Sequence, residues 1–302
     1  MKRMVKNILR GIGTTIAVVA LLTASVCFAG SLNTNWETST IEVMGEGVPP
    51  PNAISAAQAR ILARRAAVVD GYRQLAEGIK GVKVDSATTA GMTMIADDTT
   101  NTRVQAVIKG ARVTSEGISP DGGYYVIMSV PMYGVNSLAA VVLPRTSLRE
   151  NFPAPNASIP TSQPNVNVKI SVNQGIGAPS HGSSAAPAPM GRALGIYTGL
   201  VVDCRGLGLN PVMSPVIRTE RGEPIYGYRN LIPELVIANG MASYTYDPAS
   251  VSRAGSNPLV VRAIALEGHN ANPVVSTADA NRILIENGAT HFLDNCAVVF
   301  IR

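Results

Sequence analysis

Histidine, cysteine and aromatic residues are scarce in this chain. Its 302 residues contain three histidines and three cysteines, and aromatic residues make up 5%. No Cys/His cluster has the spacing of a metal site, and neither an H-E-x-x-H motif nor a Walker phosphate loop is present. The scarcity of aromatic residues also argues against a stacking platform for bases or sugars. The sequence therefore predicts a protein without a metal or another cofactor.

Long apolar runs are missing everywhere except at the N-terminus. Four basic residues within the first ten positions precede an apolar run over residues 12–28, which is the order of a secretory signal peptide spanning residues 1–29. Cleavage between Ala29 and Gly30 fits best, because small residues are needed one and three places before the cut. Ala29 fits the first place, and Cys27 is acceptable in the second.

Two alternatives for this segment stay open. Lipidation at Cys27 requires a small residue directly before the cysteine and usually a leucine three places before it, but the chain has Val26 and Ala24 there. An uncleaved anchor is the other alternative, because the run is close to the minimum of ~18 residues for a membrane span. We expect membrane association only through lipidation at Cys27.

The chain beyond the signal segment has little excess charge. The formal net charge is +5, and the first 29 residues contribute four basic and no acidic side chains, so +1 remains after their removal. The remaining chain has no clear basic surface for nucleic acid or for an anionic membrane. We therefore expect no nucleic-acid partner.

Cys204 and Cys296 remain after removal of the signal segment. Two cysteines in an exported chain predict one disulfide, and closing a loop of 92 residues would stabilise the protein by about 4–5 kcal/mol in the chain-entropy model. If the segments 201–204 and 295–300 are neighbours in one sheet, the two cysteines can meet. The alternative is a pair of buried free thiols.

A segment rich in Pro, Ser, Asn, Gly and Ala divides the chain at residues 144–192. Its apolar residues are too sparse to offset the entropy of ordering, so we interpret it as a linker, with one strand-like stretch at 166–172. The division predicts two small α+β domains, residues 30–143 and 193–302. The linker would let the second domain reach a separate partner.

The first domain is predicted to be a long helix packed on a largely antiparallel sheet. Alternating residues predict a strand at 38–47, and Ser55 with Gln58 forms a capping-box pattern for a helix that stops near Gly78. One face of this helix has apolar residues at helical spacing, namely Ile61, Val68, Tyr72, Leu75 and Ile79.

The rest of the first domain is predicted to be mostly β-structure. Three further runs are rich in β-forming residues, namely 81–86, 102–119 and 123–134. Asp121–Gly122 marks a hairpin turn. A short helix is expected at 134–143, just before the linker.

The second domain is predicted to be a mixed α+β domain. The expected strands are 196–204, a hairpin at 214–227 around Arg221–Gly222, and the segments 258–268 and 296–301. A helix is expected at 276–289, with Ser276 or Thr277 as its N-cap and Gly288 as its stop.

Two groups of residues are candidates for function. Arg60, Arg64, Arg65 and Arg73 on the long helix are candidates for binding an acidic partner, with an ordinary solvated helix face as the alternative. His291 and Asp294 are the only candidates for catalysis, as a base and its orienting carboxylate. No G-x-S-x-G motif accompanies them, and the alternative is a structural histidine near a domain end.

The strand IEVMGEG, the helix AQARILARRAAVVDGYRQLAEG and the stretch VQAVIKGARVTSEGISPDGGYYVIMSVPMYG follow one another over residues 40–143. This pattern resembles the LPP-twenty family of bacterial envelope lipoproteins, whose fold is also used by flagellar outer-membrane accessory proteins P and T. Those proteins build rings or disks around the basal body. The resemblance implies a non-enzymatic surface or periplasmic role and supplies no catalytic residue. The second domain looks like a C-terminal domain of envelope proteins without an assigned activity.

These observations predict a non-catalytic exported protein of the periplasm or the outer-membrane periphery. We expect it to act through protein–protein contacts in a flagellar or outer-membrane assembly, with envelope or flagellar proteins as partners and with oligomers allowed. A periplasmic enzyme that uses the second domain is one alternative. A protein that binds cell-wall fragments or a small molecule is another.

Overall fold

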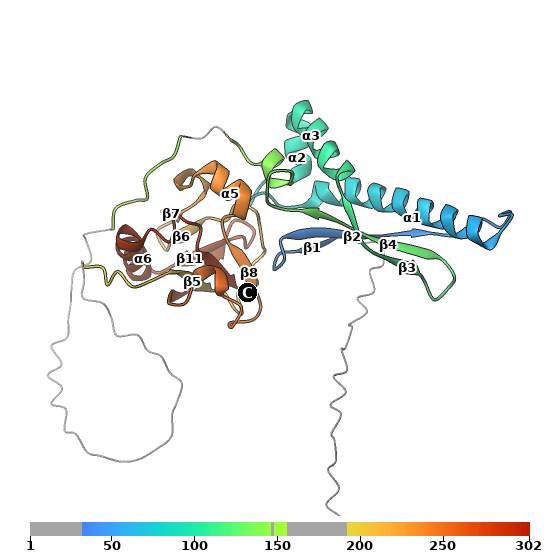
Figure 1. Ribbon diagram of the computed structural model, residues 1–302. Helices are drawn as coiled ribbons and strands as arrows, with labels where there is room; N and C mark the ends of the chain where they lie inside the picture. The colour runs from blue at the N-terminus through green and yellow to red at the C-terminus, as the bar shows by residue number, and fades with distance from the viewer. Residues whose placement is uncertain (1–31, 146–147, 156–191) are drawn as a thin grey trace, which may run out of the picture.

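A helix lying on a sheet forms an arm that projects from the body of the molecule (Figure 1). The computed structural model describes residues 32–145, 148–155 and 192–302. The predicted signal peptide, with Cys27, Ala29 and Gly30, and the strand-like stretch 166–172 lie outside the described residues. No helix among the described residues is long and apolar enough to cross a membrane.

The sheet of the arm is antiparallel, as predicted, with the order β1-β2-β4-β3. Its strands are β1 (Asn33–Asn35), β2 (Thr40–Gly47), β3 (Arg112–Ile118) and β4 (Tyr124–Pro131). The predicted hairpin turn is confirmed, because Gly122 has a φ of 86° and Ser119 N–H donates to Gly123 O at 2.9 Å. The register pairs Gly47 with Tyr124 at the free end of the arm.

The helix α1 (Ala56–Gly78) begins where the capping box predicts. Gln58 N–H donates to Ser55 Oγ at 3.1 Å, and Ile54 N–H donates to Gln58 Oε1 at 2.7 Å. The end near Gly78 is also confirmed, with the 3₁₀ turn η1 (Ile79–Gly81) following directly.

The face of α1 that meets the sheet is made of small residues, which corrects the predicted apolar face. Ala63, Ala67 and Gly71 are buried against β2 and β4, whereas Ile61 is 55% exposed. A Cβ added to Gly45 would lie 2.1 Å from Ala67 O, so helix and strand touch through their backbones. Of the five predicted apolar residues only Leu75 and Ile79 are fully buried, and they continue the four-residue spacing of the small residues.

Residues 102–119 are not all β-structure, which is a second correction. Their first part belongs to α3 (Asp98–Lys109), which follows α2 (Ala90–Ala96), and only the last part forms β3. Asp97 caps α3 by accepting hydrogen bonds from Thr99 N–H and Thr100 N–H. Val104 and Ile108, four residues apart, are buried, and this packing overrides the β-propensity of the Thr- and Val-rich sequence. The short helix is confirmed as α4 (Ala139–Val142).

The second domain contains one parallel and one mixed sheet, as the mixed α+β class predicts. The parallel sheet has the order β8-β12-β5-β9, with β5 (Gly199–Asp203), β8 (Ser243–Thr245), β9 (Pro258–Arg262) and β12 (Val298–Ile301). The mixed sheet has the order β10-β11-β6-β7, with β6 (Ile217–Thr219), β7 (Pro224–Tyr226), β10 (Ala265–Glu267) and β11 (Asn272–Val275).

The helix predicted near the C-terminus of the second domain is confirmed. The predicted helix is α6 (Thr277–Thr290), capped by Ser276 Oγ, which accepts from Asp279 N–H at 3.0 Å. Three shorter elements complete the domain, namely α5 (Pro233–Asn239), η2 (Tyr228–Asn230) and η3 (Ser252–Ala254). The predicted strand 258–268 is divided between β9 and β10, which belong to different sheets.

The predicted disulfide is not formed, because Cys204 and Cys296 are both free and buried. Their strands β5 and β12 are neighbours, as expected, but they run parallel with Asp203 paired to Ile301. Cys204 therefore follows the end of one strand while Cys296 precedes the start of the other. The register separates them by roughly 20 Å along the strands, well beyond the reach of a disulfide.

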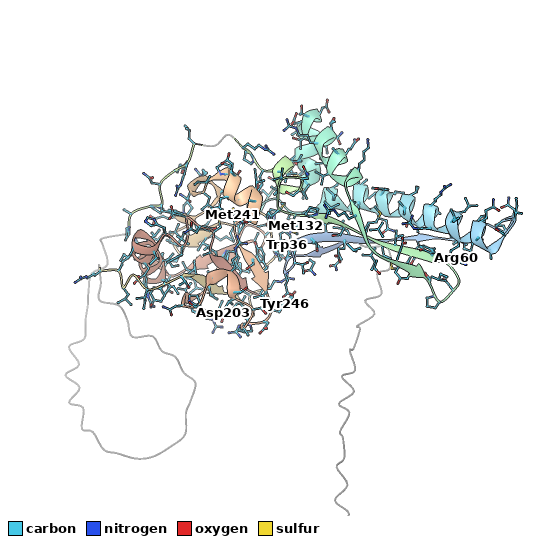
Figure 2. All side chains as sticks on the ribbon, viewed as in Figure 1. Trp36, Arg60, Met132, Asp203, Met241 and Tyr246 are labelled. Carbon is cyan, nitrogen blue, oxygen red and sulfur yellow. The ribbon has the colours of Figure 1, made fainter. Side chains whose placement is uncertain are left out.

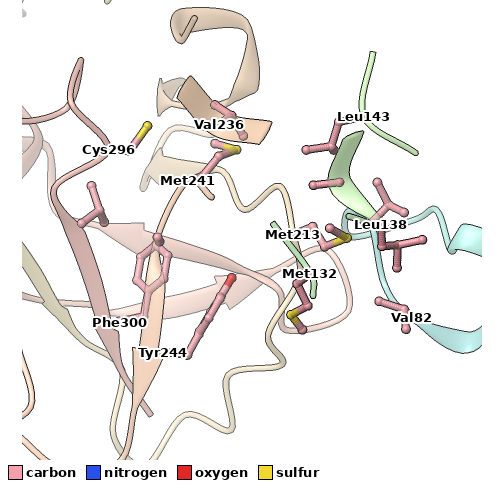
Figure 3. Packing of buried hydrophobic residues seen from close by; sticks show 14 of the residues in the cluster. Val82, Met132, Leu138, Leu143, Met213, Val236, Met241, Tyr244, Cys296 and Phe300 are labelled. Carbon is pink, nitrogen blue, oxygen red and sulfur yellow. The ribbon is translucent and has the colours of Figure 1, made fainter. Parts of the chain in front are cut away.

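The two domains share one continuous hydrophobic core. Met213 of the second domain projects toward Met132 and Leu138 of the first domain (Figure 3). Trp36 packs edge-on against Tyr244, with 5.5 Å between ring centroids. The domains are therefore joined by a packed interface in addition to the predicted linker.

Part of the predicted linker belongs to the second domain. Residues 148–155, called the strap below, lie across it: Glu150 N–H donates to Arg229 O at 2.8 Å, and Phe152 stacks on Tyr226 with 6.5 Å between centroids. The strap is thus packed by main-chain bonds and one aromatic contact, which the Pro- and Ser-rich composition did not predict.

Candidate functional site

One edge of the arm is closed by side chains of α1. The strand β1 covers only the first part of β2, and further along Glu46 N–H donates to Asp70 Oδ2 at 3.1 Å while Gln74 Nε2 donates to Met44 O at 2.9 Å. Asp70 also accepts from Arg73 at 2.7 Å. Side chains thus satisfy backbone groups of β2 that have no strand partner, which protects this edge from pairing with another chain.

The electrostatics of Asp70 follow from these contacts. Partial burial alone would raise the pKa of this carboxyl, but the hydrogen bonds from Arg73, Glu46 N–H and Gln74 together lower it. Asp70 is therefore a charged structural anchor between α1 and β2. This role explains the presence of Asp70 and Arg73 in the helix stretch that carries the family resemblance.

The opposite edge of the arm is open. The helix α1 packs over β2 and β4, and β3 is exposed at six of its seven residues. Val113 and Ile118 are paired with Met128 and Tyr124, so they lie on the same face of the sheet as α1, in the part over β3 that the helix does not cover. Because strands are ~4.8 Å apart and a helix is ~10 Å wide, one helix covers about two strands, and a strip over β3 stays free.

The predicted arginines divide into two pairs. Arg64 Nε forms an ion pair with Glu116 of β3 at 2.8 Å, and Arg73 contacts Asp70 and Glu77. Arg60 and Arg65 are exposed and have no ion pair among the residues that the structure describes. Figure 2 places Arg60 near the free end of the arm, far from Trp36 and Met132 at its base.

Exposed apolar residues surround these two arginines. Ile54, which directly precedes the N-cap Ser55, is 91% exposed, and Ile61 of α1 is 55% exposed. Two more lie at the ends of the strands on either side of β4, namely Val48 directly after β2 and Ile118 at the end of β3. We call these four residues with Arg60 and Arg65 the distal patch. Residues 53–69 contain no acidic side chain, so the helical part of the patch is basic.

A second exposed apolar group lies at the base of the arm, on α2. Met92 and Ile95 are 54% and 87% exposed, and Asp97 and Asp98 follow them directly. Hydrogen bonds from the Thr100 side chain and from Thr99 and Thr100 N–H lower the pKa of Asp97. We call Met92, Ile95, Asp97 and Asp98 the basal patch. The sequence analysis missed it because α2 was not predicted.

The proposed catalytic pair is occupied by structural contacts. His291 Nδ1 lies 3.5 Å from Asp294 Oδ2, but the same carboxylate pairs with Arg149 of the strap and accepts from Asn287 Nδ2 at 3.1 Å. His291 is the left-handed C-cap of α6, with φ 56°. The arrangement anchors the strap to the end of α6.

A buried carboxylate and a small cavity of the second domain also have structural explanations. Glu286 is buried and accepts hydrogen bonds from Leu194 N–H and Gly195 N–H at 2.9 and 3.0 Å, so it fixes the start of the domain. A small cavity lies between the strap and α6, lined in part by Pro153, Thr219 and Thr277. The described residues contain no group of three or more His, Cys, Asp or Glu that could hold a metal ion.

Two segments of the chain are similar to known protein families. Residues 49–131 match the LPP20 lipoprotein family, and residues 199–302 match the second domain of Treponema pallidum Tp0624. No curated protein matches the chain. The first match covers α1 to α3 together with the strands β3 and β4, and it confirms the resemblance to the LPP20 lipoproteins over these residues but not the relation to flagellar accessory proteins. The matched family is one of lipoproteins, which supports an exported protein of the cell envelope.

Proposed function

We propose that this protein is a non-catalytic component of the cell envelope that assembles with other proteins through its arm. The observation that carries the proposal is the distal patch, where apolar side chains and two unpaired arginines surround the free end of α1. Isolated exposed apolar residues are ordinary, but a group of them beside unpaired charges marks an interaction surface.

The packed domain junction supports a scaffold role. Because the arm and the second domain share one core, a contact made at the distal patch also fixes the orientation of the second domain. The predicted independent reach of the second domain is not needed for this function. The protein would present several surfaces at a constant angle.

The non-catalytic part of the proposal is supported by the contacts of His291 and Asp294. Arg149 and Asn287 occupy the Asp294 carboxylate, and the pair lies at the end of α6 under the strap. These contacts give His291 and Asp294 a structural role, so a catalytic role is not needed to explain why the two residues lie together.

The wider setting that we propose is a flagellar or outer-membrane assembly, in the periplasm or at the outer-membrane periphery. This step rests on the resemblance of residues 40–143 to the fold of flagellar accessory proteins. We propose cleavage between Ala29 and Gly30, with lipidation at Cys27 as the alternative. The intact mass of the protein isolated from its native envelope distinguishes the two.

Photo-crosslinking in intact cells tests the assembly role. A photoreactive phenylalanine placed at Ile61 should capture discrete envelope proteins, which mass spectrometry would identify. The matched control is the same residue at Val135, which is also exposed but lies in a loop outside both patches. Equal capture of bulk envelope proteins at the two positions would contradict the proposal.

A further inference from the structure

Two exposed apolar patches of opposite charge lie on one molecule. The distal patch combines Ile54 and Ile61 with Arg60 and Arg65, and the basal patch combines Met92 and Ile95 with acidic residues. The helices α2 and α3 stand at the base of the arm, away from its free end (Figure 1). The rigid arm therefore keeps the two patches of one chain apart.

The distal patch leaves room for a helix beside α1, because β3 is the edge strand and the strip over it is open on its outer side. The strip itself is one strand wide, with Val113 and Ile118 on it and the Arg64–Glu116 ion pair between helix and strand. An added strand fits less well, because the register of β3 shifts between Val113 and Ser115. Such a bulge disturbs the ladder that a strand partner would extend.

The basal patch has the shape of a helical ligand. Met92 and Ile95 are three residues apart on α2, so they lie on one face, while Ala90 and Met94 are buried and hold the helix in place. Asp98 has no hydrogen bond or ion pair among the described residues, and it is exposed next to this face. An apolar face flanked by a carboxylate complements the apolar residues of the distal patch, which are flanked by Arg60 and Arg65; these three charged groups form no ion pair among the described residues.

We propose that the basal patch of one copy docks on the distal patch of a second copy. This inference rests on the proposed assembly function and names a partner for it. The contact is heterologous, because two different surfaces meet, so a bound pair still offers one free patch of each kind, one on each copy. Repetition of such a contact gives a closed ring or an open filament.

Complementary variants test this contact in solution. The protein, purified after export, should associate with rising concentration in sedimentation velocity. Ile61→Asp should remove the distal patch and Ile95→Asp the basal patch, each weakening association by about tenfold or more, because docking would bury an unpaired carboxylate. A mixture of the two variants should form a one-to-one dimer and nothing larger, since one intact patch of each kind remains.

Charge reversal tests the same pairing independently. Arg65→Glu and Asp98→Lys should each weaken association of that variant alone. A mixture of the two variants should regain it, because the unaltered Asp98 of one meets the unaltered Arg65 of the other and the two reversed charges also attract each other. The double variant should regain it as well, since both reversed charges are then on every copy. Added salt should weaken association of the unaltered protein. Val135→Asp, at an exposed position outside both patches, is the control and should associate normally.

The outcomes separate this inference from the assembly role itself. A purified protein that stays monomeric, or variants that fail to dimerise when mixed although each is folded by circular dichroism, would overturn the contact between copies. Specific capture of other envelope proteins from Ile61 in cells would leave the assembly role standing in that case. Capture of the same chain, linked through α2, would support both.

Discussion

Gly45 of β2 lies directly against Ala67 of α1. A Cβ on Gly45 would be 2.1 Å from Ala67 O and 2.4 Å from Gly71 N, which are backbone atoms that cannot rotate away. We expect Gly45→Ala to lower the free energy of unfolding by about 3 kcal/mol or more, because helix and strand must separate. Gly288→Ala is the matched control, since nothing lies within 4 Å of its added Cβ.

Chemical denaturation measures both variants. Gly288 lies in the last turns of α6 and is exposed, so alanine there should leave stability unchanged or raise it by up to about 1 kcal/mol. If Gly45→Ala matched the control, the close contact between α1 and β2 would be refuted.

Asp70 should make the stability of the arm depend on pH. Its pKa is lowered in the folded state, so the carboxylate contributes stability above its unfolded pKa of about 3.9, and this contribution is lost as the pH falls through the folded value. Asp70→Asn should cost about 1–2 kcal/mol at pH 7 and progressively less below about pH 4.

The control for this pH dependence is Asp98→Asn. That carboxylate is exposed and has no partner among the described residues, so its replacement should change stability little at any pH. A loss from Asp70→Asn that stayed constant down to about pH 2 would contradict the assigned role.

The cysteines should behave as buried thiols. Burial raises the pKa of Cys204 to about 12, and burial also raises that of Cys296. A thiol reagent should therefore react with the exported protein slowly in the native state, and with two thiols per chain after unfolding without reductant. A chain lighter by two hydrogens, with no reactive thiol in denaturant, would show a disulfide instead.

The strap should stabilise the second domain mainly through the aromatic ring of Phe152. Phe152→Ala removes the stack on Tyr226 and should lower the free energy of unfolding by about 1–2 kcal/mol. Leu148→Ala in the same segment is the control, because Leu148 is almost fully exposed and should change stability by less than about 0.5 kcal/mol. Equal effects at the two positions would argue against packing of the strap.

The two domains should unfold together. Trp36 is the single tryptophan and lies at the junction, so its fluorescence reports on the interface, while far-ultraviolet circular dichroism reports on all helices. We expect the two signals to change in one coincident transition. Two separated transitions would show that the junction is weaker than its shared core implies.

Local signals in the sequence predicted much of this fold. The capping box at Ser55, the turn at Asp121–Gly122 and the helix after Ser276 are decided by neighbouring residues, and each is present. The start of α3 also had a local signal, the capping carboxylate of Asp97, but the Thr- and Val-rich sequence after it favoured a strand. Tertiary burial of two side chains decided the outcome there.

Other features depend on relationships that one sequence does not display. The cysteines were expected to be near each other because their segments flank neighbouring strands, which β5 and β12 are, but the parallel direction of pairing separates them. Strand direction depends on the connections between strands. The arm's small-residue face had a signal, because Gly45 and Gly47 in the strand match Ala63, Ala67 and Gly71 four residues apart in the helix. The strap and the distal patch depend on which surfaces stay uncovered after packing.

The main-chain bonds at the domain junction bear on how far the sequence can diverge. Met213 N–H donates to Lys83 O, Ser214 N–H to Val84 O at 2.7 Å, and Gly134 N–H to Ile237 O at 2.7 Å. Every residue except proline can supply these donors. Relatives could therefore replace most side chains along these segments and inherit the same angle between arm and body, so that geometry would be preserved in evolution long after sequence identity had faded.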